Sequence, residues 1–187
     1  MKTTICLASL LLVMALPAGA TLYQSGTLGG TVIPDNNAIG TGTAMQYTFT
    51  GLSGNTISGA VTLNFTLAGG YGTDLSGYLR LGNLTTSPYY DLTSTVQAAP
   101  TISGSGQLFT VNVSTAFGGA DPSGQWTLFF ADTSPVGTTT VNNWSLDVNA
   151  TPAVPEPVNV ALGIFGAGMV GCLMTRRYVH SRKSAAN

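Results

Sequence analysis

Short stretches of alternating apolar and polar residues recur through the middle of the chain. The clearest is residues 60–68, in which Val61, Leu63, Phe65 and Leu67 share one face. A period of two is typical of half-buried strands. The same alternation predicts four further strands, marked by Met45, Tyr47 and Phe49, by Phe109, Val111 and Val113, by Trp126, Leu128 and Phe130, and by Trp144, Leu146 and Val148.

Turn-forming residues separate these stretches, and no long segment between them has the 3.6-residue period of a helix. We therefore predict that residues 21–150 form an all-β sandwich, of jelly-roll-like or Greek-key topology. The last two strands are expected to form a hairpin. The turn sequence Asp121-Pro122-Ser123-Gly124 precedes Trp126, and a Gly/Thr-rich loop precedes Trp144. Both indoles are expected to face one core.

Two apolar segments flank this body. Residues 1–20 are typical of a signal peptide: Lys2 precedes a short apolar run, and Ala18 and Ala20 occupy the −3 and −1 positions of a cleavage site. A retained N-terminal anchor is the alternative. Residues 158–175 are long enough for a short transmembrane helix. The basic tail 176–187 follows at once and is expected to stay cytoplasmic, since it holds a stop-transfer cluster of Arg176, Arg177, Arg182 and Lys183.

A Pro-rich linker, residues 151–157, joins the body to this expected span. It ends in the motif Val154, Pro155, Glu156, Pro157, whose prolines favour an extended, accessible backbone. The ordered combination of motif, span and arginine cluster resembles the PEP-CTERM sorting signal of Gram-negative bacteria. That resemblance implies processing near the motif by an exosortase, a membrane-embedded peptidase. The alternative is an ordinary single-pass anchor after a Pro-rich linker.

The body resembles the P domain, or Homo B domain, of proprotein convertases and bacterial subtilisin-like proteases. The similarity is carried by Gln125-Trp126-Thr127-Leu128 and Asn143-Trp144-Ser145-Leu146, with Ile33-Pro34-Asp35-Asn36 upstream. Residues 61–65 and 73–75 resemble that domain's central pair of strands. The chain departs from the family in two loops, where residues 68–72 hold no His and residues 82–85 replace a Pro-x-Gly sequence. We expect no catalytic domain beside the body, so the resemblance implies a packing or binding role.

Charge and chemistry narrow the function further. Charged residues make up 7% of the chain, and Arg80 is the single basic residue between Lys2 and Arg176, which argues against a nucleic-acid partner. The body has no His and no Cys, because His180 lies in the tail and Cys6 and Cys172 lie in the apolar segments. Nucleophilic triads and zinc sites therefore cannot form, and we expect no enzymatic activity.

The remaining candidate residues are acidic or aromatic. Asp35, Asp121 and Asp132 are interpreted as turn-fixing residues. No cofactor is expected, although Asp74 and Asp91, in polar segments, are candidate calcium ligands, with solvated surface charge as the alternative. Four tyrosines at or near expected loops are candidate contacts for sugar or protein, with a role at the edge of the core as the alternative. They are Tyr71, Tyr78, Tyr89 and Tyr90.

These observations favour an exported, non-enzymatic surface or extracellular-matrix protein associated with exopolysaccharide. Its expected partners are signal peptidase, exosortase, the membrane before processing, and polysaccharide. It would first be anchored in the inner membrane facing the periplasm and then reach the cell surface or medium. Two alternatives remain: a carbohydrate-binding or adhesion module, calcium-dependent or not, and an accessory subunit of a separately encoded surface protease.

Overall fold

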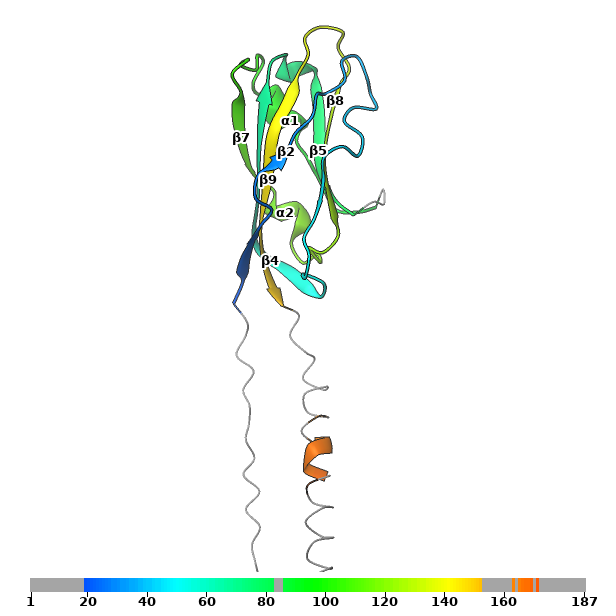
Figure 1. The fold of residues 1–187 in the computed structure, drawn as a ribbon, viewed down its shortest axis with the longest axis vertical. Coiled ribbons are helices and arrows are strands. Elements are labelled where there is room, and N and C mark those ends of the chain that lie inside the picture. The colour runs from blue at the N-terminus through cyan, green and yellow to red at the C-terminus, as the bar shows by residue number, and fades with distance from the viewer. Residues whose placement is uncertain (1–18, 83–85, 153–162, 164, 170, 172–187) are drawn as a thin grey trace, which may run out of the picture. The chain divides into compact units, whose positions relative to one another are not determined.

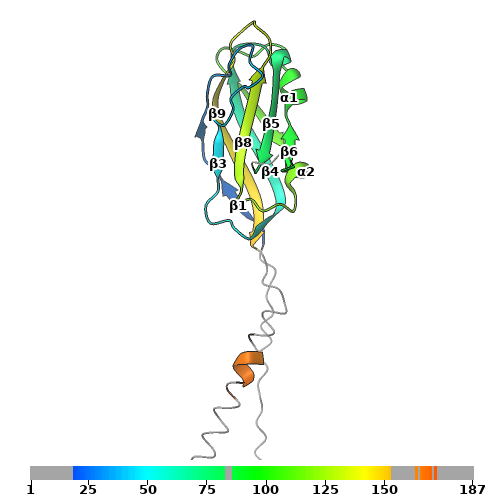
Figure 2. The ribbon, with the colours of Figure 1, turned by 90° about the vertical axis from the view of Figure 1, so that its right-hand side faces the viewer.

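The computed structural model describes residues 19–82 and 86–152, and residues 163, 165–169 and 171 further on. The chain divides into two units, residues 1–152 and 153–187. In the first unit, two antiparallel sheets face each other across a shared apolar core (Figures 1 and 2). The predicted all-β sandwich is confirmed in this respect.

The larger sheet has five strands in the order β1-β9-β4-β7, and β2 also pairs with β9. The two long strands β4 and β9 lie at its centre and pair along most of their length. Its members are β1 (Thr21–Gln24), β2 (Leu28–Gly29), β4 (Asn55–Ala68), β7 (Gln107–Asn112) and β9 (Thr140–Pro152). The last strand thus runs two residues beyond the boundary expected at residue 150.

The smaller sheet has the order β3-β8-β5-β6 and faces the viewer in Figure 2. Its members are β3 (Gln46–Thr48), β5 (Leu75–Leu81), β6 (Tyr89–Asp91) and β8 (Gln125–Asp132). Short helices in the connections were not expected from the sequence. They are the 3-10 turn η1 (Gly72–Asp74), α1 (Thr93–Gln97), which packs against β5, and α2 (Ser114–Phe117), which packs against β4.

The core is built from the inward residues of the alternating segments. Val61, Leu63, Phe65 and Leu67 are all 0% exposed, as the period of two predicts. Ring contacts link the two layers, because Phe65 of β4 lies 5.3 Å, centroid to centroid, from Phe130 of β8. Gly77 of β5 lies opposite Phe130, and a Cβ there would overlap the Phe130 ring.

The expected terminal hairpin is wrong. β8 pairs with β3 and β5, whereas β9 pairs with β1, β2 and β4, so the two strands lie in opposite sheets. The connecting loop therefore crosses from one sheet to the other instead of reversing the chain within one sheet. Trp126 and Trp144 still face one core, because the inner faces of both sheets do so, and both are at most 1% exposed.

Most of the expected targeting features lie outside the described residues. These are the signal segment through Ala18, the motif Val154, Pro155, Glu156, Pro157, most of the span 158–175, and the cluster of Arg176, Arg177, Arg182 and Lys183. Ala20, the expected last residue of the signal, is described and exposed. In the C-terminal unit, residues 163, 165–169 and 171 are helical. Among the described residues, no helix has both the length and the hydropathy needed to span a bilayer.

Candidate functional site

The outer face of the smaller sheet carries the candidate site. Alternation along β5 directs Leu79 and Leu81 into the core and Tyr78 and Arg80 outward. The strand register then fixes their neighbours. Tyr78 lies opposite Phe129 of β8, while Arg80 and Gln46 of β3 lie on either side of Thr127. Strand pairing therefore collects an aromatic pair, a cation, an amide and a hydroxyl on one surface.

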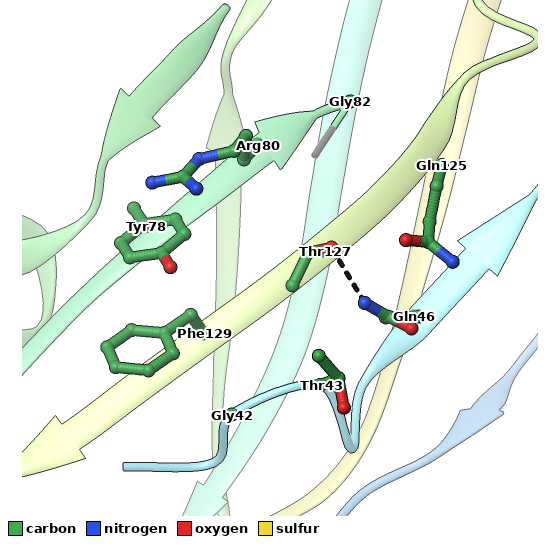
Figure 3. Close-up of a pocket in the computed structure, with 9 residues that line it drawn as sticks. All are labelled: Gly42, Thr43, Gln46, Tyr78, Arg80, Gly82, Gln125, Thr127 and Phe129. Atoms are coloured by element: carbon green, nitrogen blue, oxygen red, sulfur yellow. Dashed lines mark hydrogen bonds between the residues drawn. The ribbon is translucent and has the colours of Figure 1, made fainter. Parts of the chain in front are cut away.

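These side chains line an open groove of about 280 Å³ (Figure 3). This volume lies just below the range for small-molecule sites, roughly 300–1,000 Å³, so the groove would hold only part of a larger ligand. Figure 3 marks a side-chain hydrogen bond from Gln46 Nε2 to Thr127 Oγ1, at 3.4 Å, and the Gly82 backbone N–H donates to the Gln125 carbonyl oxygen at 2.7 Å. The described residues of the lining contain no carboxylate, imidazole or thiol. They are Gly42, Thr43, Gln46, Tyr78, Arg80, Gly82, Gln125, Thr127 and Phe129.

An aromatic stack positions the cation in this groove. The rings of Tyr78 and Phe129 are stacked with centroids 4.7 Å apart and an interplanar angle of 14°. The guanidinium carbon of Arg80 lies 4.6 Å from the centroid of the Tyr78 ring, within the range of a cation–π contact. Figure 3 shows Tyr78 between the other two side chains. The Tyr78 ring therefore stacks on Phe129 and also contacts the Arg80 guanidinium.

The four tyrosines expected to contact a ligand are not brought together. Tyr78 lines the groove from the middle of a strand, which corrects its expected place near a loop. Tyr89 of the edge strand β6 lies opposite Arg80 and is 58% exposed. Tyr90 instead packs against the core. Tyr71 precedes η1 and lies beside Gly137 of the β8–β9 loop.

The two expected calcium ligands also lie apart. Asp91 of β6 is opposite Tyr78 of β5, whereas Asp74 ends η1, four residues before Tyr78 in the chain. Each already accepts a hydrogen bond, Asp91 from the Thr93 backbone N–H at 2.8 Å and Asp74 from the Thr73 hydroxyl at 3.2 Å. Within the described ranges, no group of three or more His, Cys, Asp or Glu residues is arranged to hold a metal ion.

Asp121 stabilises a turn, as its position predicts. Its carboxylate accepts hydrogen bonds from the backbone N–H groups of Ser123, at 2.9 Å, and Gly54, at 3.3 Å. Hydrogen bonds from Ser123 are the main cause that lowers the pKa of Asp121. The turn ahead of β8 is thereby fixed to the segment ahead of β4.

Asp132 combines a turn role with burial. Its Oδ1 accepts the Ser134 backbone N–H at 3.0 Å, while its Oδ2 is buried with no hydrogen-bond partner in the described structure. Desolvation raises the pKa of Asp132, and the nearby charges of Asp35 and Asp74 add to this, against a lowering by the Ser134 bond. Asp35 itself is exposed, and Asn37 makes the turn bond there, accepting from the Ile39 N–H at 2.8 Å.

Apart from Tyr78, sequence reasoning missed the residues that make the groove. Gln46, Gln125 and Thr127 are ordinary polar positions of half-buried strands, and their meeting depends on the order of strands in the sheet. Arg80 did carry a signal, as a lone cation spaced two residues from Tyr78 in an alternating segment.

No family model and no curated protein matches the chain. The choice of ligand therefore depends on the chemistry of the groove itself.

Proposed function

We propose that the protein is an exported, non-enzymatic surface or extracellular-matrix protein that holds exopolysaccharide through the groove on its smaller sheet. In this proposal the two sheets are the jelly roll of a P-domain-like body. The groove is the observation that carries the proposal. An open sheet face that presents Gln46, Thr127 and Gln125 beside an aromatic pair offers amide and hydroxyl groups to the hydroxyls of a sugar chain.

Export and sorting are supported by the order of the terminal segments. A signal peptide, the Val154-to-Pro157 motif, an apolar span and a basic tail follow one another as in PEP-CTERM proteins. Signal peptidase and exosortase are then the processing partners. The body passes from the periplasmic face of the inner membrane to the cell surface or medium of a Gram-negative bacterium.

Binding without catalysis is the simplest role for this groove. Sugar hydrolysis commonly needs a pair of carboxyl groups on either side of the scissile bond. The lining residues supply none, and Asp91, the acidic residue opposite Tyr78, already accepts a hydrogen bond from Thr93. The groove therefore suits retention of a polymer at the surface.

The sorting half of the proposal is tested by changing the motif. Replacing Pro155, Glu156 and Pro157 together by Ala should leave a longer, membrane-bound form, because the extended peptide that the peptidase grips is lost. Fractionation and immunoblotting of the native host measure this, with Ser184→Ala as a control in the tail. Unchanged processing and release of the triple variant would contradict the proposal.

The binding half is tested with the full chain, kept soluble in a non-ionic detergent, on an array of bacterial polysaccharides. Wild-type protein should bind at least one polymer, and Gln46→Ala should weaken that binding. Thr110→Ala is the matched control, because Thr110 is exposed on the outer face of the larger sheet. Absence of binding to every polymer, or equal loss in the control variant, would refute a polysaccharide role for the groove.

A further inference from the structure

The single cation of the body lies in the candidate groove. Between Lys2 and Arg176 the chain has no basic residue except Arg80, whereas Asp residues occur throughout this region. Arg80 stands in the middle of the smaller sheet, between Thr127 of β8 and Tyr89 of β6. This single positive charge, in the groove of an otherwise acidic body, gives the groove a local attraction for an anionic group.

Within the described structure, the Arg80 guanidinium has neither an acidic partner nor a hydrogen-bond acceptor. Its side chain forms no ion pair or hydrogen bond there, and its Nε is buried with no hydrogen-bond acceptor. A guanidinium has five N–H donors, and a buried donor such as this Nε is unfavourable when it has no acceptor. The contact with Tyr78, itself stacked on Phe129, holds the group in place without using its donors. The guanidinium is thus oriented before any ligand arrives.

The surroundings of Arg80 favour an anion that also carries hydroxyls. The other polar lining residues, Gln46, Gln125, Thr43 and Thr127, are neutral donors and acceptors. The acidic side chain on the same face, Asp91, pairs in register with Tyr78 and lies beyond ion-pair distance of Arg80. A neutral sugar would leave the guanidinium unpaired, whereas a planar carboxylate matches its fork with two parallel hydrogen bonds.

We propose that the groove selects an acidic polysaccharide and binds the carboxylate of a uronic-acid residue through Arg80. In this arrangement Gln46, Thr127 and Gln125 bind the ring hydroxyls, and Tyr78 with Phe129 fixes the guanidinium. The inference rests on the proposed function, since it names the class of polysaccharide that the same groove takes. Sulfate esters share the negative charge but not the planar two-oxygen geometry, so they are a separate arm of the test.

The experiment measures binding of the full chain, in the same detergent, to polygalacturonate, alginate, dextran and dextran sulfate. Wild-type protein should bind the two uronate polymers at least ten times more tightly than dextran, and added salt should weaken that binding. Arg80→Gln should reduce uronate affinity by about ten- to a hundredfold, as expected for loss of charge-assisted hydrogen bonds. Arg80→Lys, which keeps the charge but loses the fork, should fall in between.

A second variant separates loss of the carboxylate contact from general damage. Thr127→Val keeps the shape of the side chain and leaves Arg80 in place, so it should weaken uronate and neutral sugar by the same factor. Melting curves of all variants should stay close to that of wild type. Equal affinity for dextran and the uronates, or unchanged uronate binding by Arg80→Gln, would overturn the uronate inference while leaving a polysaccharide role intact.

The other outcomes are equally informative. Binding of dextran sulfate as tight as that of polygalacturonate would overturn selection for carboxylate and assign the groove to polyanions in general. Absence of binding to all four polymers together with binding of another polysaccharide on the array would also overturn the inference. If the protein bound none of the four polymers and no polysaccharide on the array, the proposed function itself would be overturned.

Discussion

The hydrogen bond from Trp126 to the turn before β8 offers a sharp test of how the last part of the body is stabilised. Trp126 is 0% exposed, and its Nε1 donates to the carbonyl oxygen of Pro122 at 3.1 Å. Its ring also meets Phe117 of α2, with centroids 4.8 Å apart. Trp126→Phe keeps an aromatic ring in the core but removes the donor, so the Pro122 carbonyl loses its partner.

Trp144 provides the matched comparison. It is 1% exposed and faces the same core from the opposite sheet, but its indole N–H donates to none of the described residues. Each Trp→Phe change removes a similar amount of packed ring, worth roughly 1–2 kcal/mol at about 0.8 kcal/mol per buried CH₂ equivalent. Only Trp126→Phe also leaves a buried carbonyl unsatisfied, which costs about 1–3 kcal/mol more.

Urea unfolding of the full chain, followed by far-UV circular dichroism, measures this difference without depending on either indole. With an m-value of roughly 2 kcal/mol per molar urea, an excess of 2 kcal/mol separates the two midpoints by about 1 M. The Trp126→Phe midpoint should be the lower one. If Trp144→Phe unfolds at the same or a lower urea concentration with an equal m-value, the bond to Pro122 contributes no net stability and the reasoning fails.

Three further predictions concern the acidic side chains. Burial raises the folded-state pKa of Asp132 above 3.8, so the stability of the folded state falls as pH rises from about 3.8 through that raised value. Asp132→Asn should remove this fall and have a higher melting temperature than wild type at pH 7. Parallel curves of melting temperature against pH for variant and wild type would contradict this. Because the pKa of Asp121 is lowered, Asp121→Asn should have a lower melting temperature than wild type at pH 7 and the same melting temperature once the pH falls below the lowered pKa. A difference in melting temperature that persists in acid would show a different cause. Because Asp74 and Asp91 lie apart, the melting temperature should be the same in calcium and in chelator, and a rise with calcium would reveal a native-state site.

The strands were readable from the sequence because each inward face has a strict period of two. Residues 60–68 predict most of β4 without help from any other part of the chain. β5 was harder to see, since Gly77 interrupts its apolar face, and Gly77 is there because Phe130 of a strand some fifty residues away needs the space. The residues around Gly77 in the sequence do not indicate that Phe130 is its neighbour.

The partition of strands between two sheets was beyond sequence reasoning. The turn chemistry around Asp132 predicts a chain reversal equally well for a hairpin and for a loop that crosses between layers. The long-range pairing of β9 with β4 decides between them. The groove inherits the same difficulty, because Gln46 and Arg80 meet on either side of Thr127 only once the order β3-β8-β5 is known.

The pairing of β1 with the end of β9 has a mechanical consequence. Thr21 lies opposite Ala150, so the body's first strand is bonded alongside the strand through which the chain leaves at Pro152 (Figure 1). Tension applied at Pro152 runs along β9, which is flanked by β1 and β2 on one side and β4 on the other. Such a load would shear many interstrand backbone hydrogen bonds at once, instead of breaking them one after another. The body is therefore suited to resist drag when it is held by its C-terminal end.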